Sequence, residues 1–432
     1  MSARGFGDIE FVETLRHPDF PHLVHVVLGS EEGLTGLGET FLNAEAVETY
    51  VHSQLAPRLV GAPVGNLPEL WRRIGAASDG RRPHSGSLSV DSGATSAIDL
   101  AAWDLRARAL GLPLHDALGG TVRDAIRVYV TAVDPDHLPP RAAQPHERAA
   151  SDDWGLGGTR ESAHHDWTDS LERPAELARE LVDEGFTALK LFPFVRLDDA
   201  TAGLSISAAQ LADNLEPFRA VREAVGDRID LAVDLASMWT LAPALQIARA
   251  LSPFELMWLE DPLRISALDA VGRLSDAMTM PLAGYDYRCG LPAYIDLIER
   301  GRIALVRMDV GWVGGLTEAL RIAAYAEARG LGVILHDCAG PVAWASSIHA
   351  ALHLPNAVIQ ECVRAYARDI YPQIARGLPT LQGGRARPAG GPGHGLELSG
   401  EYVARARRRR SSLSADGRWQ GEEGAPEDHG HA

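Results

Sequence analysis

Short apolar runs, rich in β-branched residues, recur along the second half of the chain and alternate with segments of helical periodicity. A continuous apolar run bounded by polar residues is typical of a buried parallel strand, and apolar positions three or four apart are typical of an amphipathic helix. The pattern therefore predicts alternating strands and helices from about residue 126. The strand-like runs are RVYVTAV, TALKLF, IDLAVDL, LMWLEDP, MPLAG, IALVRMDV, GVILHD and AVIQEC.

The spacing of these runs is regular. The residues near six successive strand ends follow one another at steps of 26, 24, 25, 27 and 25 residues: Asp234, Glu260, Gly284, Asp309, His336 and Glu361. One strand and one helix in each step predict an α/β fold of the modified (β/α)₈ TIM barrel type. A doubly wound open sheet is the alternative. It ranks lower because the strands do not divide into two halves and no G-x-G-x-x-G opens a helix.

The N-terminal part has a different pattern. HLVHVVLGSEEGLTGLGETF alternates apolar and polar residues around glycine turns, which predicts antiparallel strands, and helical segments follow it. We therefore predict an α+β capping domain at 1–125, the barrel at 126–375 and a C-terminal segment returning to the cap at 376–402. Residues 403–432 combine a basic run with an acidic, glycine-rich end and are expected to be disordered.

Composition narrows the functional classes. The chain has 432 residues, a net charge of −17 and a pI of about 5.4, which argues against a nucleic-acid partner. Its three cysteines are too scattered for a disulfide framework or a zinc cluster, so a reducing interior is expected. No apolar leader and no apolar run of membrane-spanning length is found, which predicts a cytoplasmic protein without a membrane partner.

Ionisable residues occupy nearly every predicted strand end. Apolar strands have no structural need of them, and buried charges are costly unless they pair or bind a metal ion. Because the carboxyl ends of barrel strands form the active site, these residues are candidates for chemistry. They are Lys190, Asp234, Glu260, Asp309, His336 and Glu361.

The types of these residues suggest roles. Asp234 and Glu260 on adjacent strands would suit Mg²⁺, although they could instead pair with Lys190 and Arg307. Asp309 could orient His336 as a base or acid, whereas a lone histidine would more often be structural. Lys190 could hold a substrate carboxylate or stabilise a developing negative charge. Glu361 could form a hydrogen bond on the far side of the same pocket.

At residues 20–400 the chain resembles the enolase superfamily, in the mandelate racemase/muconate lactonizing enzyme branch and nearest the acid-sugar dehydratases. The resemblance rests on SAIDLAAWDLRARALGLPLHDALGG, GFTALKLFPF, WLEDPL, MDVGWVGGLTEALRIAAYAEARG, HDCAGPVAWASSIHAALHLPNAVIQE and GPGHGLEL. It implies a cap and a modified barrel, a Mg²⁺ ion, removal of the proton α to a carboxylate, and a homo-oligomer. It also implies that Asp234 and Glu260 are metal ligands, that Lys190 is the basic residue of the second strand, and that Glu361 is the last-strand acid. Asp309 and His336 match the family's dyad.

Three positions depart from the family pattern. Phe192 replaces a second base two residues after Lys190, which argues against a racemase, and Ala236 replaces a polar residue. Tyr285 stands where the third carboxylate ligand is usual, with Asp286 next to it. A shift of one residue along a strand turns a side chain to the opposite face, but Asp286 could reach the ion if the strand has ended. Asp286, Tyr285, water or the loss of the metal all remain open.

These residues together predict a Mg²⁺-dependent lyase that dehydrates an acid sugar or related hydroxy-carboxylate through an enediolate. The alternatives are an epimerase or cycloisomerase acting on another carboxylate, and a catalytically degenerate relative that binds an acid. Cap residues His17, His22 and Arg82 are candidates for binding substrate hydroxyls or a distal carboxylate, although each could be an ordinary surface residue.

Overall fold

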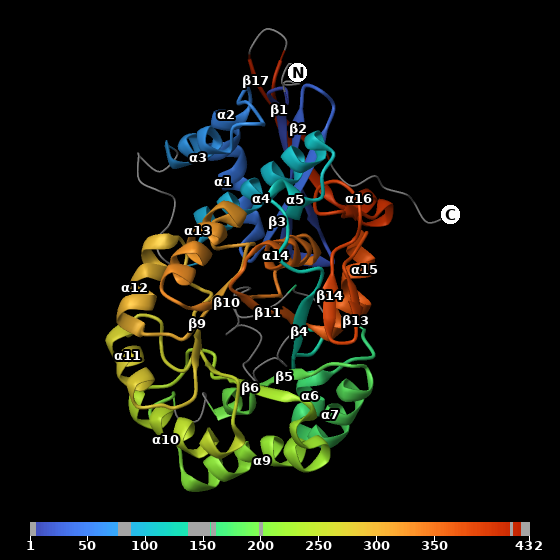
Figure 1. Ribbon diagram of the computed structural model, residues 1–432. Helices are drawn as coiled ribbons and strands as arrows, with labels where there is room; N and C mark the ends of the chain where they lie inside the picture. The colour runs from blue at the N-terminus through green and yellow to red at the C-terminus, as the bar shows by residue number, and fades with distance from the viewer. Residues whose placement is uncertain are drawn as a thin grey trace.

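The computed structural model describes residues 6–76, 88–136, 156, 161–197, 202–414 and 418–424. It consists of a barrel and a cap built on an antiparallel sheet, with the cap at the top of Figure 1 and the barrel below it. None of the helices in the described part of the chain has the length and apolar character that crossing a membrane requires.

Eight parallel strands close into a barrel. Each strand pairs with the next, and the last pairs with the first, so the predicted (β/α)₈ barrel is confirmed and an open sheet is excluded. Every strand lies in one of the predicted apolar runs, except that the first begins one residue earlier, at Ile126. They are β4 (Ile126–Thr131), β5 (Ala188–Leu191), β6 (Asp230–Asp234), β7 (Leu259–Glu260), β8 (Leu282–Gly284), β9 (Leu305–Met308), β10 (Gly332–Leu335) and β11 (Ala357–Cys362).

Amphipathic helices surround the barrel (Figure 1). The first of them buries Leu177, Ala178 and Leu181, one helical face, while the opposite face meets solvent. Because all the strands are parallel, their carboxyl ends lie together at one end of the barrel. The helices that follow successive strands are α7 (Pro174–Asp183), α9 (Ala208–Val225), α10 (Leu241–Leu251), α11 (Leu268–Asp276), α12 (Leu291–Gly301), α13 (Gly315–Ala328) and α14 (Pro341–His353).

The interior of the barrel is a packed apolar layer. The rings of Tyr129 and Trp258 meet edge to face with their centroids 5.2 Å apart. Ala188, Ala232 and Ala283 face them from three other strands, so small side chains make room for the large ones. This layer forms the floor beneath the charged residues of the strand ends.

The cap is an antiparallel sheet covered by one long helix. Helix α4 (Val90–Leu110) packs closely on the third strand, because a Cβ at Gly36 or Gly38 would lie 2.1 or 2.0 Å from a carbonyl oxygen of the helix. Only glycine allows this approach. The strands of the sheet are β1 (Ile9–His17), β2 (Phe20–Ser30), β3 (Thr35–Phe41), β16 (Arg407–Leu413) and β17 (Trp419–Gly424), and they lie in the order β17-β16-β1-β2-β3.

The outer strands of the cap sheet come from the C-terminal tail. The prediction of disorder from residue 403 is wrong for β16 (Arg407–Leu413), which pairs with β1, and for β17 (Trp419–Gly424), which pairs with β16. Successive arginines of β16 point to opposite faces of the sheet, so their positive charges have partners on neighbouring side chains. Arg410 lies 4.0 Å above the Phe11 ring and 2.8 Å from a carboxylate oxygen of Glu13.

The segment at 376–402 contacts both the barrel and the cap. Its hairpin, β13 (Thr380–Gln382) and β14 (Arg385–Arg387), extends the barrel sheet at β4. Further on, the backbone N–H of His394 donates to Asp104 Oδ1 over 3.0 Å, and the His394 ring lies 3.0 Å from the carbonyl oxygen of Leu37. This segment therefore joins the cap to the barrel.

Candidate active site

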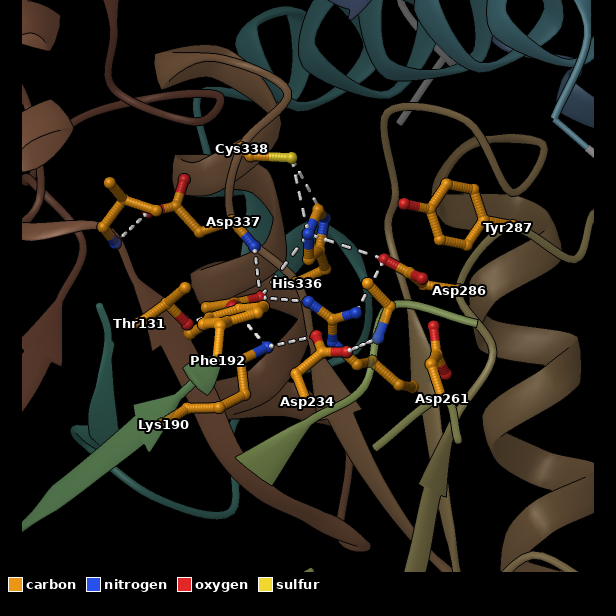
Figure 2. Close-up of a pocket in the computed structure, with 14 residues that line it drawn as sticks. Thr131, Lys190, Phe192, Asp234, Asp261, Asp286, Tyr287, His336, Asp337 and Cys338 are labelled. Atoms are coloured by element: carbon orange, nitrogen blue, oxygen red, sulfur yellow. Dashed lines mark hydrogen bonds and ion pairs between the residues drawn. The ribbon is translucent and has the colours of Figure 1, made fainter. Parts of the chain in front are cut away.

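A cavity opens at the carboxyl ends of the barrel strands. It encloses about 570 Å³ of space, a volume that includes open solvent at its mouth. Figure 2 shows side chains from several strand ends converging there, with Lys190, Asp234, Asp286 and His336 among them. The topology therefore brings together residues far apart along the chain, such as Thr131 and Glu361, which are 230 positions apart.

Lys190, at the end of β5, is fully buried and ion-paired. Its Nζ lies 2.5 Å from Glu260 Oε1 and 2.9 Å from Glu361 Oε1, between the rings of Tyr129 and Phe192. Burial and the charge of Arg307 oppose its protonation, but the two glutamates outweigh them and raise the pKa of Lys190 well above its ordinary value. Lys190 is therefore a fixed positive charge rather than a base.

Asp234 and Glu260 lie side by side at the ends of β6 and β7. Both oxygens of Glu260 have protein partners: Oε1 lies 3.0 Å from Arg307 Nη1, besides its contact with Lys190, and Oε2 accepts from Trp258 Nε1 over 2.8 Å. Burial raises the pKa of Glu260, but Arg307 and Lys190 outweigh it and lower that pKa. Burial and then Glu260 raise the pKa of Asp234 well above its usual range.

The end of β8 presents Asp286 to the cavity and not Tyr285. The strand ends at Gly284, so the alternation of faces no longer applies and Asp286 turns inward. Tyr285 is fully buried, does not line the cavity, and accepts from the backbone N–H of Leu263 over 3.3 Å. Burial raises the pKa of Asp286 to about 6, although Arg307 lowers it.

Arg307, on β9, extends its guanidinium among these carboxylates. Its Nη1 lies 3.0 Å from Glu260 and 2.9 Å from Asp286 Oδ2, and its Nη2 donates to Glu361 Oε2 over 2.7 Å. Ion pairing with Lys190 and Arg307, the alternative considered for the strand-end carboxylates, is therefore what the structure contains. One guanidinium contacts carboxylates from three different strands.

His336 and Asp309 form a directly bonded pair. His336 Nδ1 lies 2.6 Å from Asp309 Oδ2, and the backbone N–H of Gly311 donates to the other oxygen of Asp309 over 2.6 Å. As a carboxylate Asp309 can only accept, so this hydrogen bond is formed with the proton on Nδ1, while Nε2 lies 3.4 Å from Cys338 Sγ. Nε2 faces the cavity, 3.5 Å from Asp286 Oδ2 and 3.6 Å from Glu361 Oε2.

Glu361, at the end of β11, lies between the two cations and the dyad. Besides Lys190 and Arg307 it accepts hydrogen bonds from the Thr131 hydroxyl and the backbone N–H of Asp337. Burial opposes its charge, but Arg307 and Lys190 outweigh burial and hold the pKa of Glu361 well below its usual value. Glu361 is therefore ionised and serves to hold these cations in place.

Two of the three cap residues proposed for substrate binding, His17 and His22, do not line this cavity. His17 stacks on Tyr402 with ring centroids 4.5 Å apart and is buried in the cap, and neither His17 nor His22 lines the cavity. They lie beside the hairpin between β1 and β2, and packing within the cap accounts for the position of His17. Arg82 lies outside the described residues.

Several lining residues were missed or undervalued in the sequence, among them Thr131, Asp261, Asp337 and Cys338. Asp261, Asp337 and Cys338 each follow a predicted site residue within two positions, so their positions after the strand ends were a usable signal. Thr131 ends β4 and carries no charge, which hid it. A further signal in the sequence marks Lys190 as a site residue. The chain has 41 lysines and arginines, and Lys190 is the only lysine among them.

The expected metal ligands do not form a convergent set. Arg307 Nη1 lies between Glu260 and Asp286, so a positive charge stands between two of the three expected ligands. Both oxygens of Glu260 already have donors. Within the part of the chain that the structure describes, no three histidine, cysteine, aspartate or glutamate side chains are grouped to hold a metal ion. The residues present do not fit a magnesium ion bound by Asp234, Glu260 and Asp286.

Comparisons of sequence and of structure with known proteins point to the same family. A D-galactonate dehydratase from Xanthomonas oryzae pv. oryzae is 27% identical over 348 residues, covering 79% of this chain and 78% of the relative. A crystal structure of an enolase of the mandelate racemase subgroup from Agrobacterium tumefaciens is 33% identical, covers 95% of this chain and 100% of that chain, and has a TM-score of 0.78. An enolase protein from Sargasso Sea environmental sequencing is also 33% identical, covers 94% and 99%, and has a TM-score of 0.79.

Family models match both parts of the chain. Residues 18–119 match the N-terminal domain of mandelate racemase / muconate lactonizing enzyme, and residues 173–403 match the enolase C-terminal domain-like model. The first match covers most of the cap and the second covers the barrel from α7 onward together with the segment that joins it to the cap. The chain therefore belongs to the enolase superfamily, in its mandelate racemase/muconate lactonizing enzyme branch.

Proposed function

We propose that this protein is a lyase that removes the proton α to the carboxylate of an acid sugar and then expels the β-hydroxyl as water. The observation that carries the proposal is the His336–Asp309 pair, whose Nε2 faces a cavity that also contains Lys190. The D-galactonate dehydratases among the relatives support the choice of substrate class.

In the first step, the α-proton moves to His336 Nε2. The electron pair of the broken C–H bond moves into the carboxylate, which becomes an enediolate with two negative oxygens. Lys190 supplies a permanent positive charge near these oxygens, in a buried site where its effect is strong. This charge stabilises the enediolate more than the substrate, which is what lowers the barrier.

In the second step, the proton on Nε2 returns to the substrate. It goes to the β-hydroxyl oxygen as the bond from that oxygen to carbon breaks, and the enediolate electrons form the new carbon–carbon double bond. One water leaves, and the resulting enol tautomerises to a 2-keto-3-deoxy acid. His336 is then restored, so one base serves both steps.

The absence of a second base at Phe192 favours dehydration over racemisation. Phe192 lines the cavity with an apolar ring, so no proton acceptor occupies this position on the side of Lys190. Lys190 itself stays protonated, as its raised pKa indicates. A racemase that uses two bases needs one on each face of the α-carbon, and here His336 alone has that role.

Enzymes of this superfamily typically use a divalent metal ion. The magnesium ion expected from the resemblance has no part in the steps above, because Arg307 stands between Glu260 and Asp286. The positive charge of the proposed mechanism comes from side chains of the chain itself.

A screen of mono- and diacid sugars, beginning with D-galactonate, tests the proposal. We expect at least one acid to lose water and form an α-keto acid, and we expect His336→Asn to lower that rate about 10²–10⁴-fold. His353→Asn is the matched control, because His353 contacts the carbonyl oxygen of Gly120 at the end of α14, outside the cavity.

Three results would contradict the proposal. Full activity of His336→Asn would remove His336 as the base. Exchange of an α-proton without loss of water would indicate an epimerase or cycloisomerase. Binding of acids without exchange would indicate a relative that binds its ligand and no longer catalyses a reaction.

A further inference from the structure

A buried arginine lies at the centre of the strand-end carboxylates. Arg307 is 4% exposed and contacts Glu260, Asp286 and Glu361, which come from the ends of β7, β8 and β11. Four of the barrel's eight strands, including its own, are therefore linked through one guanidinium. A protein cation in contact with three buried carboxylates has the same electrostatic role that a divalent ion would have.

We propose that the guanidinium of Arg307 takes the place of the divalent ion in this chain, so that the carboxylates at the strand ends are held by a side chain and no metal ion binds among them. The inference goes beyond the proposed function, because it concerns the charge that the site contains and not the reaction that it catalyses.

The geometry of the fork supports this assignment. Nη1 lies 3.0 Å from Glu260 Oε1 and 2.9 Å from Asp286 Oδ2, and Nη2 lies 2.7 Å from Glu361 Oε2. A guanidinium is planar, always charged and able to bind two carboxylates at once. Magnesium needs oxygens at about 2.1 Å in an octahedral arrangement. An ion at that distance from Glu260 and Asp286 would be in contact with Nη1, where repulsion between like charges is strong.

The end of β8 and Arg307 on the neighbouring strand β9 fit together in space. Tyr285, which stands where a carboxylate ligand is usual in the family, is turned into the protein and hydrogen-bonded to Leu263 N. The carboxylate of this strand end comes instead from Asp286, and its Oδ2 is the oxygen that Arg307 contacts. The absence of a carboxylate at Tyr285 and the presence of the Arg307 guanidinium at the same place are therefore two parts of a single change in the site.

Binding of Mn²⁺, measured by electron paramagnetic resonance without any substrate, tests the inference. We expect the wild-type protein to leave the signal of free Mn²⁺ unchanged at 1:1 stoichiometry and roughly 100 µM, because the concentration is well below the dissociation constant of a blocked site. Arg307→Met removes the charge and keeps an apolar chain of similar reach, so it should bind one Mn²⁺ at least about 30-fold more tightly, an increase of about 2 kcal/mol.

Two further variants serve as controls. Arg307→Met combined with Asp234→Asn should lose the new site, because Asp234 is one of its carboxylates. Arg321→Met, which removes an arginine that pairs with Glu318 outside the cavity, should leave Mn²⁺ binding as in the wild type. Tight 1:1 binding to the wild type that Asp234→Asn abolishes would overturn the inference, as would a folded Arg307→Met variant that binds no Mn²⁺.

Folding of the variant needs its own measurement, because removing Arg307 leaves three buried carboxylates without this partner. We expect Mn²⁺ to raise the melting temperature of Arg307→Met and to leave that of the wild type unchanged. If Arg307→Met does not fold, the wild type decides: absence of Mn²⁺ binding supports the inference and tight binding overturns it. Metal binding is measured without substrate, so its outcome is separate from the fate of the proposed lyase activity.

Discussion

The side chain that follows the end of β8 illustrates what a sequence reveals at the scale of single residues. The identities of the strand-end residues could be predicted, because charged residues at the ends of apolar runs need a reason. Whether Tyr285 or Asp286 faces the cavity could not, because it depends on the residue at which the strand ends. Arg307 was foreseen only as a possible partner, although it lies two residues before Asp309 and so on the same face of its strand.

Lys190 allows a direct test of the buried charge cluster. As the only lysine in the chain, it gives one side-chain signal in a protein labelled with ¹³C at the lysine ε-carbon. We expect this signal not to shift between about pH 9 and about pH 11, because Glu260 and Glu361 hold the pKa of Lys190 well above its ordinary value of about 10.4.

The protein unfolded in urea is the control, and there the same signal should titrate near about pH 10.4. A midpoint at or below about 10.4 in the folded protein would show that burial outweighs the two glutamates. Lys190 would then be available as a base, contrary to the role proposed for it.

At the scale of elements, the strands and helices of the barrel were readily predicted because each buries a continuous apolar run or a periodic apolar face. The tail was not, because β16 is a string of arginines whose partners lie some 400 residues earlier in the chain, as Glu13 does for Arg410. Local composition predicted disorder, but the segment forms a strand because it pairs with the edge of β1.

Strand β16 can be tested by one proline. Ser411 lies opposite Val12 of β1, and its hydroxyl lies 2.8 Å from His52 Nδ1. Ser411→Pro removes a backbone N–H within the strand and should lower the free energy of unfolding by at least about 2 kcal/mol. Ser411→Ala, which loses only the hydroxyl, should lower it by about 1 kcal/mol. A proline variant as stable as wild type in thermal unfolding would show that this strand does not contribute.

The contact between cap helix α4 and barrel helix α13 predicts a dependence of stability on pH. Asp99 accepts from Trp71 Nε1, Thr317 Oγ1 and Thr317 N, and burial, opposed by these bonds, raises its pKa to about 6. The folded protein therefore keeps a proton that the unfolded chain releases near about pH 4. The stability from this proton is present below about pH 4 and is lost as the pH rises through about 6.

Asp99→Asn should remove this dependence. Relative to that variant, the free energy of unfolding of the wild type should fall by about 2 kcal/mol between about pH 4 and about pH 7, measured by urea denaturation. Asp269→Asn, whose side chain is 82% exposed, controls for the loss of one carboxylate. Parallel pH profiles for the wild type and Asp99→Asn would contradict the assignment.

At the scale of the whole molecule, the cap and barrel were both predictable as fold classes, because their hydrophobic patterns differ. The substrate contacts expected from the cap were not confirmed: His17 packs within the cap, and Arg82 lies outside the described residues. Such contacts depend on how loops fold over the cavity, which periodicity does not encode. Assembly into a homo-oligomer and a cytoplasmic location remain predictions.

The central claim is that this barrel ionises the carbon next to a carboxylate, and exchange of that hydrogen with deuterium measures it most directly. D-Galactonate and related acid sugars are incubated with the protein in deuterated buffer, and the α-proton signal is followed by nuclear magnetic resonance. We predict that one acid loses this signal or forms product labelled from solvent, and that His336→Asn slows the change about 10²–10⁴-fold. An unchanged α-proton for every acid that binds, or an equal rate in His336→Asn, would contradict the account.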